Sequence, residues 1–130
     1  MTLQVLNGPV IEAGEFLSDG LDCSGGDIVR ITAPAGWSGA NLTFQISTDG
    51  NGYNDLYTAR GEEVTITLKK PGSAIIVLNE EWVKAINWLK IRSGTGNHPV
   101  AQAERREFAI AVEVADSPAR TTPTAGPRRR

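Results

Sequence analysis

The chain has 130 residues, of which 40% are hydrophobic and 22% charged, and it contains 14 glycines and 7 prolines. This length supports one domain with a hydrophobic core, and the glycine and proline content favours a β-rich fold over a helical one. No apolar run approaches the roughly 20 residues that a membrane-spanning helix needs, so a membrane is not expected among its partners. The N-terminus lacks the basic and apolar segments of a signal peptide, so synthesis in a cytoplasm is expected.

Charge is distributed unevenly along the chain. Residues 1–115 carry nine Lys/Arg and fourteen Asp/Glu, a net charge of −5, whereas residues 116–130 carry four arginines and one aspartate, a net charge of +3. The acidic body argues against nucleic-acid binding by the folded domain. The basic end, with Arg120, Arg128, Arg129 and Arg130, is a candidate contact for nucleic acid or for an acidic protein surface.

The first third of the chain predicts strands separated by turns. Residues 3–18 predict one or two strands interrupted by a turn at Asn7-Gly8-Pro9. Residues 21–26 predict a loop, and residues 27–33 predict a strand that ends at Pro34. Residues 34–39 then form a connection that carries Trp37.

The segment "LTFQISTDGNGYNDLY", residues 42–57, predicts a β-hairpin. Leu42, Phe44 and Ile46 alternate with polar residues, which places them on one face of a strand. The sequence Asp49-Gly50-Asn51-Gly52 supplies residues that tolerate the positive φ angles of a tight turn. A second, aromatic strand over Tyr53–Tyr57 completes the hairpin.

The remainder of the chain predicts further strands. The alternating residues 62–70 indicate one strand, and the apolar run 73–79 indicates another that is buried on both faces or central in its sheet. Residues 80–88 fit a short helix or a turn of loop equally well. Residues 88–94 predict a strand with Leu89 and Ile91 inward, and residues 107–114 predict the last strand.

Seven to nine short strands at intervals of about ten residues are typical of an antiparallel sandwich or barrel. The predicted fold is all-β, an antiparallel, jelly-roll-like sandwich over residues 1–115. Residues 116–130 contain three prolines and no large apolar residue. They predict a flexible tail, because such a segment cannot bury enough surface to offset the entropy of ordering.

The residue types that carry catalysis or bind metals are sparse. Cys23 is the only cysteine, and its neighbours Asp22 and Asp27 are expected to raise the thiol pKa rather than lower it. His98 is the only histidine and lies in a loop that ends at Pro99. One histidine and one distant cysteine do not make a zinc site. We therefore expect no catalytic residues, no metal, no cofactor and no enzyme activity.

The hairpin invites comparison with two kinds of binding site. Asp49, Asn51 and Asp55 resemble the start of a calcium loop, but the twelfth position from Asp49 is Arg60 rather than glutamate, so turn chemistry explains them better. The aromatic residues Trp37 and Tyr53 are candidates for a ligand-stacking surface. Core packing is the competing explanation for Trp37.

Three segments together resemble small β-sandwich proteins encoded among the structural genes of tailed bacteriophages. They are the hairpin 42–57, the segment "WLKIRSGTGNHPVAQAERR" at 88–106 and the final strand "FAIAVEV" at 108–114. The resemblance implies a virion protein, foremost a capsid decoration (cement) protein that bridges subunits of the major capsid protein. The hairpin also resembles that of discoidin-like and other carbohydrate-binding jelly rolls, which implies the alternative of a glycan- or receptor-binding module of a fibre or tail.

Assembly follows from the same resemblance. A sandwich of this size has edge strands that must be blunted or paired, and binding on a symmetric shell favours clustering about a local axis. We therefore expect a homo-oligomer, with a trimer favoured over a monomer, on the capsid surface of a virion.

Overall fold

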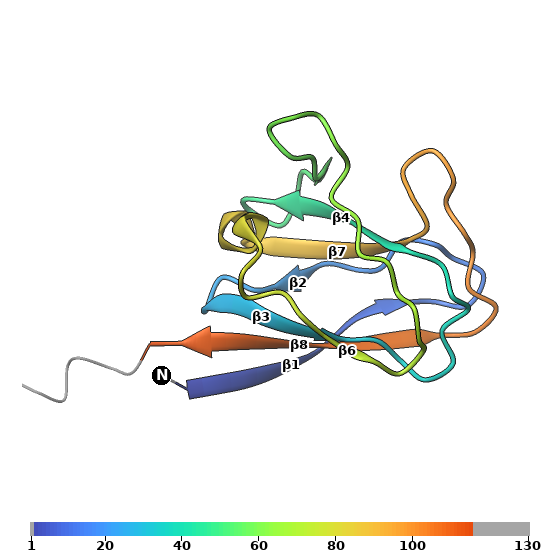
Figure 1. The fold of residues 1–130 in the computed structure, drawn as a ribbon, viewed down its shortest axis with the longest axis horizontal. Coiled ribbons are helices and arrows are strands. Elements are labelled where there is room, and N and C mark those ends of the chain that lie inside the picture. Colours follow the sequence, from blue (N-terminus) through green and yellow to red (C-terminus); the bar gives the residue numbers. More distant parts are fainter. Residues whose placement is uncertain (1, 116–130) are drawn as a thin grey trace, which may run out of the picture.

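The computed structural model describes residues 2–115, and it consists of strands and loops with one short 3-10 helix (Figure 1). The elements in chain order are β1 (Thr2–Ile11), β2 (Leu21–Asp22), β3 (Asp27–Thr32), β4 (Leu42–Ser47), β5 (Asn54–Asp55), β6 (Ala74–Ile76), η1 (Glu81–Ala85), β7 (Trp88–Ser93) and β8 (Arg106–Val114). The expected tail, residues 116–130, lies outside the described residues.

The eight strands form two four-stranded antiparallel sheets. Sheet A has the order β1-β8-β3-β6 and sheet B the order β2-β7-β4-β5. The first strand pairs with the last, the second with the seventh, the third with the sixth and the fourth with the fifth. The chain therefore behaves as one long hairpin wrapped into two sheets, which is the jelly-roll arrangement. The prediction of an all-β, jelly-roll-like sandwich is confirmed.

The core lies between the two sheets and is built from alternate residues of the long strands. In sheet B, Phe44 of β4 lies opposite Ile91 of β7, and both side chains are buried. Leu42 of β4 and Leu89 of β7 are buried on the same face. Sheet A contributes a matching set of buried side chains, chiefly Ile28, Ile31, Phe108, Ile110 and Val112. The period-2 pattern of residues 42–46 and 107–114 thus predicted the buried face correctly.

The predicted strand over residues 62–70 is wrong. This segment makes only isolated bridges, Glu63 with Tyr57 and Ile66 with Leu42. Its amides reach two different neighbours, since Val64 donates to Leu56 and Ile66 donates to Leu42. A ladder needs consecutive pairing along one strand, so the segment stays a loop despite its alternating pattern.

The apolar run 73–79 is an edge strand rather than a central one. Only Ala74–Ile76 form β6, which pairs with β3 at the border of sheet A. Val77 is buried, whereas Ile76 is 63% exposed. The run is apolar on both faces because one face covers the core and the other lies on an uncovered sheet surface.

The structure also tests the predictions for three short segments, residues 7–9, 21–26 and 80–88. Asn7-Gly8-Pro9 does not end the first strand, because β1 continues through it with a shift of register between Asn7 and Val10. The predicted loop 21–26 begins with the short strand β2. The segment 80–88 contains the 3-10 helix η1, which buries Val83.

Phe44 should be among the most costly core positions to truncate. Its ring is fully buried and stacks on Trp82 with 5.3 Å between ring centroids. Phe44→Ala is expected to lower the free energy of unfolding by about 3–5 kcal/mol in urea titrations. Leu78→Ala, at a half-exposed side chain, is the control and should change it by about 0.5 kcal/mol or less. Equal effects of the two substitutions would contradict the assignment of the core.

Candidate functional site

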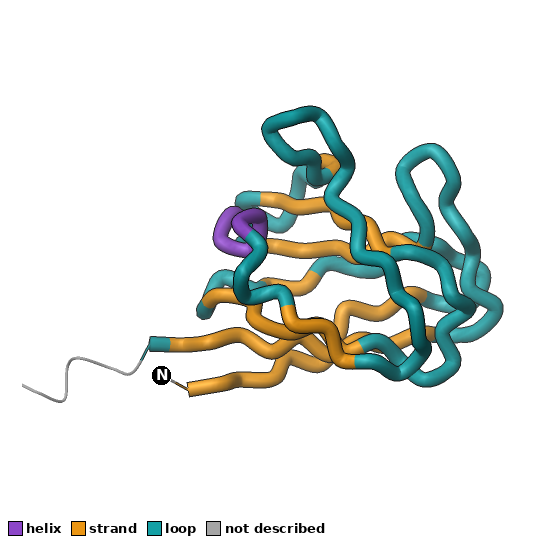
Figure 2. The backbone as a smooth tube through the Cα atoms, viewed as in Figure 1, coloured by secondary structure: helices purple, strands orange, loops and turns teal. Residues whose placement is uncertain are grey.

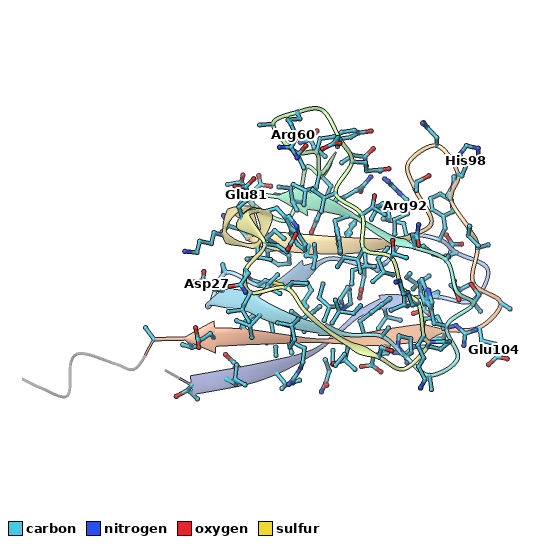
Figure 3. All side chains as sticks on the ribbon, viewed as in Figure 1. Asp27, Arg60, Glu81, Arg92, His98 and Glu104 are labelled. Atoms are coloured by element: carbon cyan, nitrogen blue, oxygen red, sulfur yellow. The ribbon has the colours of Figure 1, made fainter. Side chains whose placement is uncertain are left out.

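The most organised polar cluster in the described residues surrounds Arg92 of β7. Leu89 and Ile91 point into the core, so the alternation of the strand directs Arg92 to the opposite face of sheet B. An arginine on an outward face is ordinarily exposed, yet only 6% of this side chain is accessible. Two long loops, one after β5 and one after β7, project on either side of it (Figures 2 and 3).

Arg92 forms ion pairs with two carboxylates. Its Nη2 pairs with Asp55 of β5, and its Nη1 lies 3.1 Å from Oε2 of Glu63 in the following loop. The Thr43 hydroxyl on β4 lies 3.5 Å from Nη1. The backbone amide of Gly96, in the loop after β7, donates to Glu63 Oε2 at 3.0 Å. One guanidinium therefore joins β4, β5 and both loops, because its planar fork can reach two acceptors at once.

The electrostatics of Asp55 follow from these contacts. Partial burial acts to raise the pKa of Asp55, but the hydrogen bonds from Arg92 and Gln45, together with the positive charge of Arg92, outweigh it and lower the pKa below its ordinary value of 3.8. Gln45 Nε2 donates to Asp55 Oδ1 at 3.0 Å. The carboxylate is therefore ionised at neutral pH, and its Oδ1 accepts hydrogen bonds from both Arg92 and Gln45.

The tip of the 42–57 hairpin is closed by its own side chains. Asp49 Oδ1 accepts hydrogen bonds from the amides of Asn51 and Gly52 and from the Ser47 hydroxyl. The Asn51 and Gly52 amides are the main causes that lower the pKa of Asp49. Gly50 has φ of +85°, and a Cβ there would come within 2.9 Å of the Trp88 ring. Asp49 thus stabilises the turn, as turn chemistry predicted.

The two aromatic candidates do not form a shared platform. Trp37 is buried, its Nε1 donates to the Ala40 carbonyl at 2.7 Å, and its ring meets Phe108 edge-on at 5.3 Å. Tyr53 lies at the surface with Lys90 Nζ 4.4 Å from its ring centroid, and a Cβ on Gly20 would clash with its hydroxyl. Trp37 is therefore a core residue, and Tyr53 is held against sheet B. The other candidates, Arg120 and Arg128–Arg130, lie outside the described residues.

A shallow groove runs beside the hairpin, with a volume of about 560 Å³. Thr48, Asp49, Asn54, Asp55 and Tyr57 contribute to its lining. Two of these residues already make contacts within the fold, because Asp49 closes the turn and Asp55 pairs with Arg92. The free polar and aromatic surface of the groove is therefore carried mainly by Asn54 and Tyr57.

The only cysteine and the only histidine of the chain lie in different surroundings. Cys23 is fully buried, and its burial, followed by the negative charge of Asp22, raises the pKa of the thiol to about 12. His98 is exposed in the loop after β7 (Figure 3). Within residues 2–115, no three His, Cys, Asp or Glu side chains gather in a way that suits a metal ion. A thiol with so high a pKa is not a nucleophile at neutral pH.

Sequence reasoning missed the Arg92 cluster. Residues 55, 63 and 92 are far apart along the chain, and residues 62–70 were expected to pair as a strand. The only available signal was Asp55, which the hairpin places opposite Gln45 on the outer face of sheet B. Gln102 was missed as well: it is fully buried, and its amide donates to Ser38 and Ser93 while accepting from Arg106.

Comparison with known proteins gives no relative from which to assign a site. No family model, no curated protein and no solved structure matches this chain. Over residues 2–115, no helix has the length and apolar character that a bilayer span requires. The structural arguments about function therefore come from the jelly-roll topology and from the contacts described above.

Removing the guanidinium should destabilise the fold strongly. Arg92→Met leaves Asp55 and Glu63 facing each other without a counter-charge, so we expect the free energy of unfolding to fall by about 3 kcal/mol. Arg60→Met is the matched control, because Arg60 pairs with Glu62 while 83% of its side chain is exposed. Arg60→Met should lower the free energy of unfolding by about 0.5 kcal/mol or less. The triple variant R92M/D55N/E63Q should recover stability relative to R92M, and a lack of recovery would contradict the charge argument.

The Asp55 contact should also appear as a pH dependence of stability. The folded-state pKa of Asp55 is depressed, so its stabilising contribution is complete above the unfolded pKa of 3.8 and is lost as the pH falls through the folded value. The difference in unfolding free energy between the wild type and Asp55→Asn should be constant above about pH 5 and shrink below about pH 4. Urea titrations across this range measure the difference, and a constant value down to low pH would contradict the assignment.

Proposed function

We propose that this protein is a non-enzymatic structural protein of a tailed-phage virion, foremost a capsid decoration protein that bridges subunits of the major capsid protein. The sequence resemblance to such proteins supports this proposal, and the jelly-roll fold is compatible with it. The observation that carries it is an exposed apolar surface on sheet A. Large apolar patches on a soluble protein mark sites of interaction with other proteins.

This surface, hereafter the sheet A patch, lies on the side of sheet A that faces away from the core. The strand registers place Val5, Ala111, Arg30 and Ile76 in one row across all four strands. Leu3 lies two residues before Val5 on the same face, and the side chains of Leu3, Val5 and Ile76 are each more than half exposed. Sheet B packs on the opposite face, and within the row itself Ala111 is buried and Arg30 is half-buried.

The sheet A patch has the character of a contact surface. Its exposed apolar side chains lie at the two edges of the sheet, Leu3 and Val5 on β1 and Ile76 on β6, with Arg30 of β3 between them. Glu113 lies beside Leu3, and Asp27 of β3 lies opposite Glu113. Protein–protein interfaces combine apolar side chains with polar groups, among which arginine is enriched, and a stable contact of this type needs about 800 Å² on each partner. Binding a shell through sheet A leaves the hairpin and the loops of sheet B facing outward.

The alternative of a glycan-binding module receives less support from the geometry. Trp37 is in the core, and the hairpin carboxylates Asp49 and Asp55 are engaged in the turn and with Arg92. Carbohydrate sites usually present free polar groups beside an exposed aromatic ring. The groove beside Tyr57 is the remaining place for such a ligand, and no contact within it favours a sugar over water.

The proposal assigns the basic C-terminal residues to a second contact. Arg120 and Arg128–Arg130 lie outside the described residues, but their charge suits carboxylates on a neighbouring subunit. Each exposed ion pair contributes only about 0.2–1 kcal/mol, so such contacts act through repetition over the shell.

Co-sedimentation with phage capsids tests the function. The wild-type protein should pellet with capsids that lack their decoration protein, and Ile76→Lys should weaken this binding at least about tenfold by placing a charge in the sheet A patch. Tyr57→Lys, a half-exposed residue of the opposite sheet, is the control and should bind like the wild type. Deleting residues 116–130 should weaken binding more at low salt than at high salt. Absence of co-sedimentation with every capsid tested would overturn the proposal.

A further inference from the structure

β1 is the only long edge strand among the described strands. The two sheets end in four edges, and the edge strands β2, β5 and β6 have two, two and three residues, whereas β1 has ten. A long edge exposes a row of backbone amides and carbonyls that another strand can pair with. Natural sheets usually protect such an edge with charges, proline, a bulge or very short strands.

The second half of β1 carries this protection. Pro9 has no amide hydrogen to donate, and the register shifts between Asn7 and Val10. The Val10 amide donates to the Asp19 carboxylate at 2.8 Å, and the Asp19 amide donates back to the Val10 carbonyl at 3.1 Å. Asp19 therefore closes the edge at this position.

The first half of β1 carries none of these features. Residues 3–7, Leu-Gln-Val-Leu-Asn, contain no charge and no proline, and the pairing with β8 is regular from Thr2 to Asn7. Within residues 2–115 no strand lies on the outer side of this segment, which forms the lower border of the molecule in Figure 1. The side chains of Leu3 and Val5 are 55% and 52% exposed.

We propose that residues 3–5 of this segment pair antiparallel with residues 3–5 of a second copy of the chain, about a two-fold axis at Gln4. In this register Leu3 lies opposite Val5 of the second copy, and Gln4 lies opposite its own equivalent. The two A sheets become one continuous eight-stranded sheet. An isologous contact of this kind closes after two copies, so it produces a dimer.

The segment is complementary to itself in this register. Residues that lie opposite each other in an antiparallel pair share a face of the sheet, and Leu3 and Val5 are both on the outer face of sheet A. The axis therefore creates two Leu–Val pairs, which extend the sheet A patch across both copies. The two Gln4 amides can hydrogen-bond to each other on the other face, where no charged side chain of this segment lies.

Charge repulsion does not oppose the contact. The nearest acidic side chain on the outer face is Glu113 of β8, which lies beside Leu3. In the dimer the two Glu113 residues are separated by both copies of β1, a distance of about 14 Å at three strand spacings. This exceeds the Debye length of about 8 Å at physiological ionic strength.

The strand that pairs with the edge of β1 comes from a second copy of the chain, because the β1 segment is complementary to itself. A pairing of three residues on each copy buries less than the roughly 800 Å² per partner of a standard interface. The dimer should therefore be in equilibrium with the monomer and form as concentration rises. A foreign strand would need the same apolar alternation and the same lack of charge to compete for the edge.

Sedimentation equilibrium of the full chain from about 1 µM to about 1 mM tests the proposal. The wild type should pass from monomer to dimer in this range. L3K/V5K places a lysine opposite a lysine of the second copy and should raise the dissociation constant roughly tenfold or more. L3K/V5E places each lysine opposite a glutamate and should restore the association. Ile76→Lys, on the opposite edge of the same sheet, is the control and should leave the dimer unchanged.

A covalent test fixes the register. Residues directly opposite in an antiparallel pair have Cα atoms about 4.5–5.5 Å apart, which suits a disulfide. Gln4→Cys should therefore form a disulfide-linked dimer under mild oxidation, whereas Leu78→Cys should not. A wild type that stays monomeric throughout, a trimer, or a dimer that L3K/V5K does not weaken would each overturn the proposal. These outcomes are independent of capsid binding, which Ile76→Lys tests separately.

Discussion

The loop end of sheet B depends on the buried guanidinium of Arg92. Its two carboxylate partners come from β5 and from the loop that follows it, and Glu63 in turn accepts from an amide of the loop after β7. Arg92 and Glu63 therefore link the loop after β5 to the loop after β7. Such a cluster is stable only when complete, since a buried charge without its partner is far more costly than the intact pair is favourable.

The wrapped topology explains why these groups meet. Pairing the first strand with the last and the fourth with the seventh brings residues far apart in sequence onto neighbouring strands. It also determines where the sheet borders lie. Three borders end in strands of two or three residues, and the fourth is the long strand β1 at the start of the chain. A jelly roll leaves its edges open where a closed barrel would remove them.

The two outer faces of the sandwich have different characters. Sheet B carries the polar cluster, the closed hairpin tip and Tyr53 under Lys90. Sheet A carries the row from Val5 to Ile76, where apolar side chains remain exposed. This asymmetry is what a structural protein needs if one face is to join neighbours and the other is to meet solvent, and it connects the proposed capsid contact with the proposed dimer edge.

The sequence by itself determined the fold class and the buried face of the strands that bear a clear period of two. Residues 42–46, 89–91 and 107–114 show this period, because a half-buried strand must alternate apolar and polar side chains. The Asp49 turn was also readable, since a short carboxylate followed by glycine has a local hydrogen-bonding solution. These are properties of neighbouring residues.

Only the tertiary structure decided which segments pair and what covers each outer face. Residues 62–70 have the pattern of a strand, but their amides are divided between Leu56 and Leu42. Residues 73–79 are apolar throughout and still lie at a sheet border. Arg92 looks like a solvent-facing residue of a strand, and Trp37 fits a loop or a core. These side chains are buried by segments that are distant in the sequence. The positions of those segments depend on long-range packing, which the local sequence pattern does not predict.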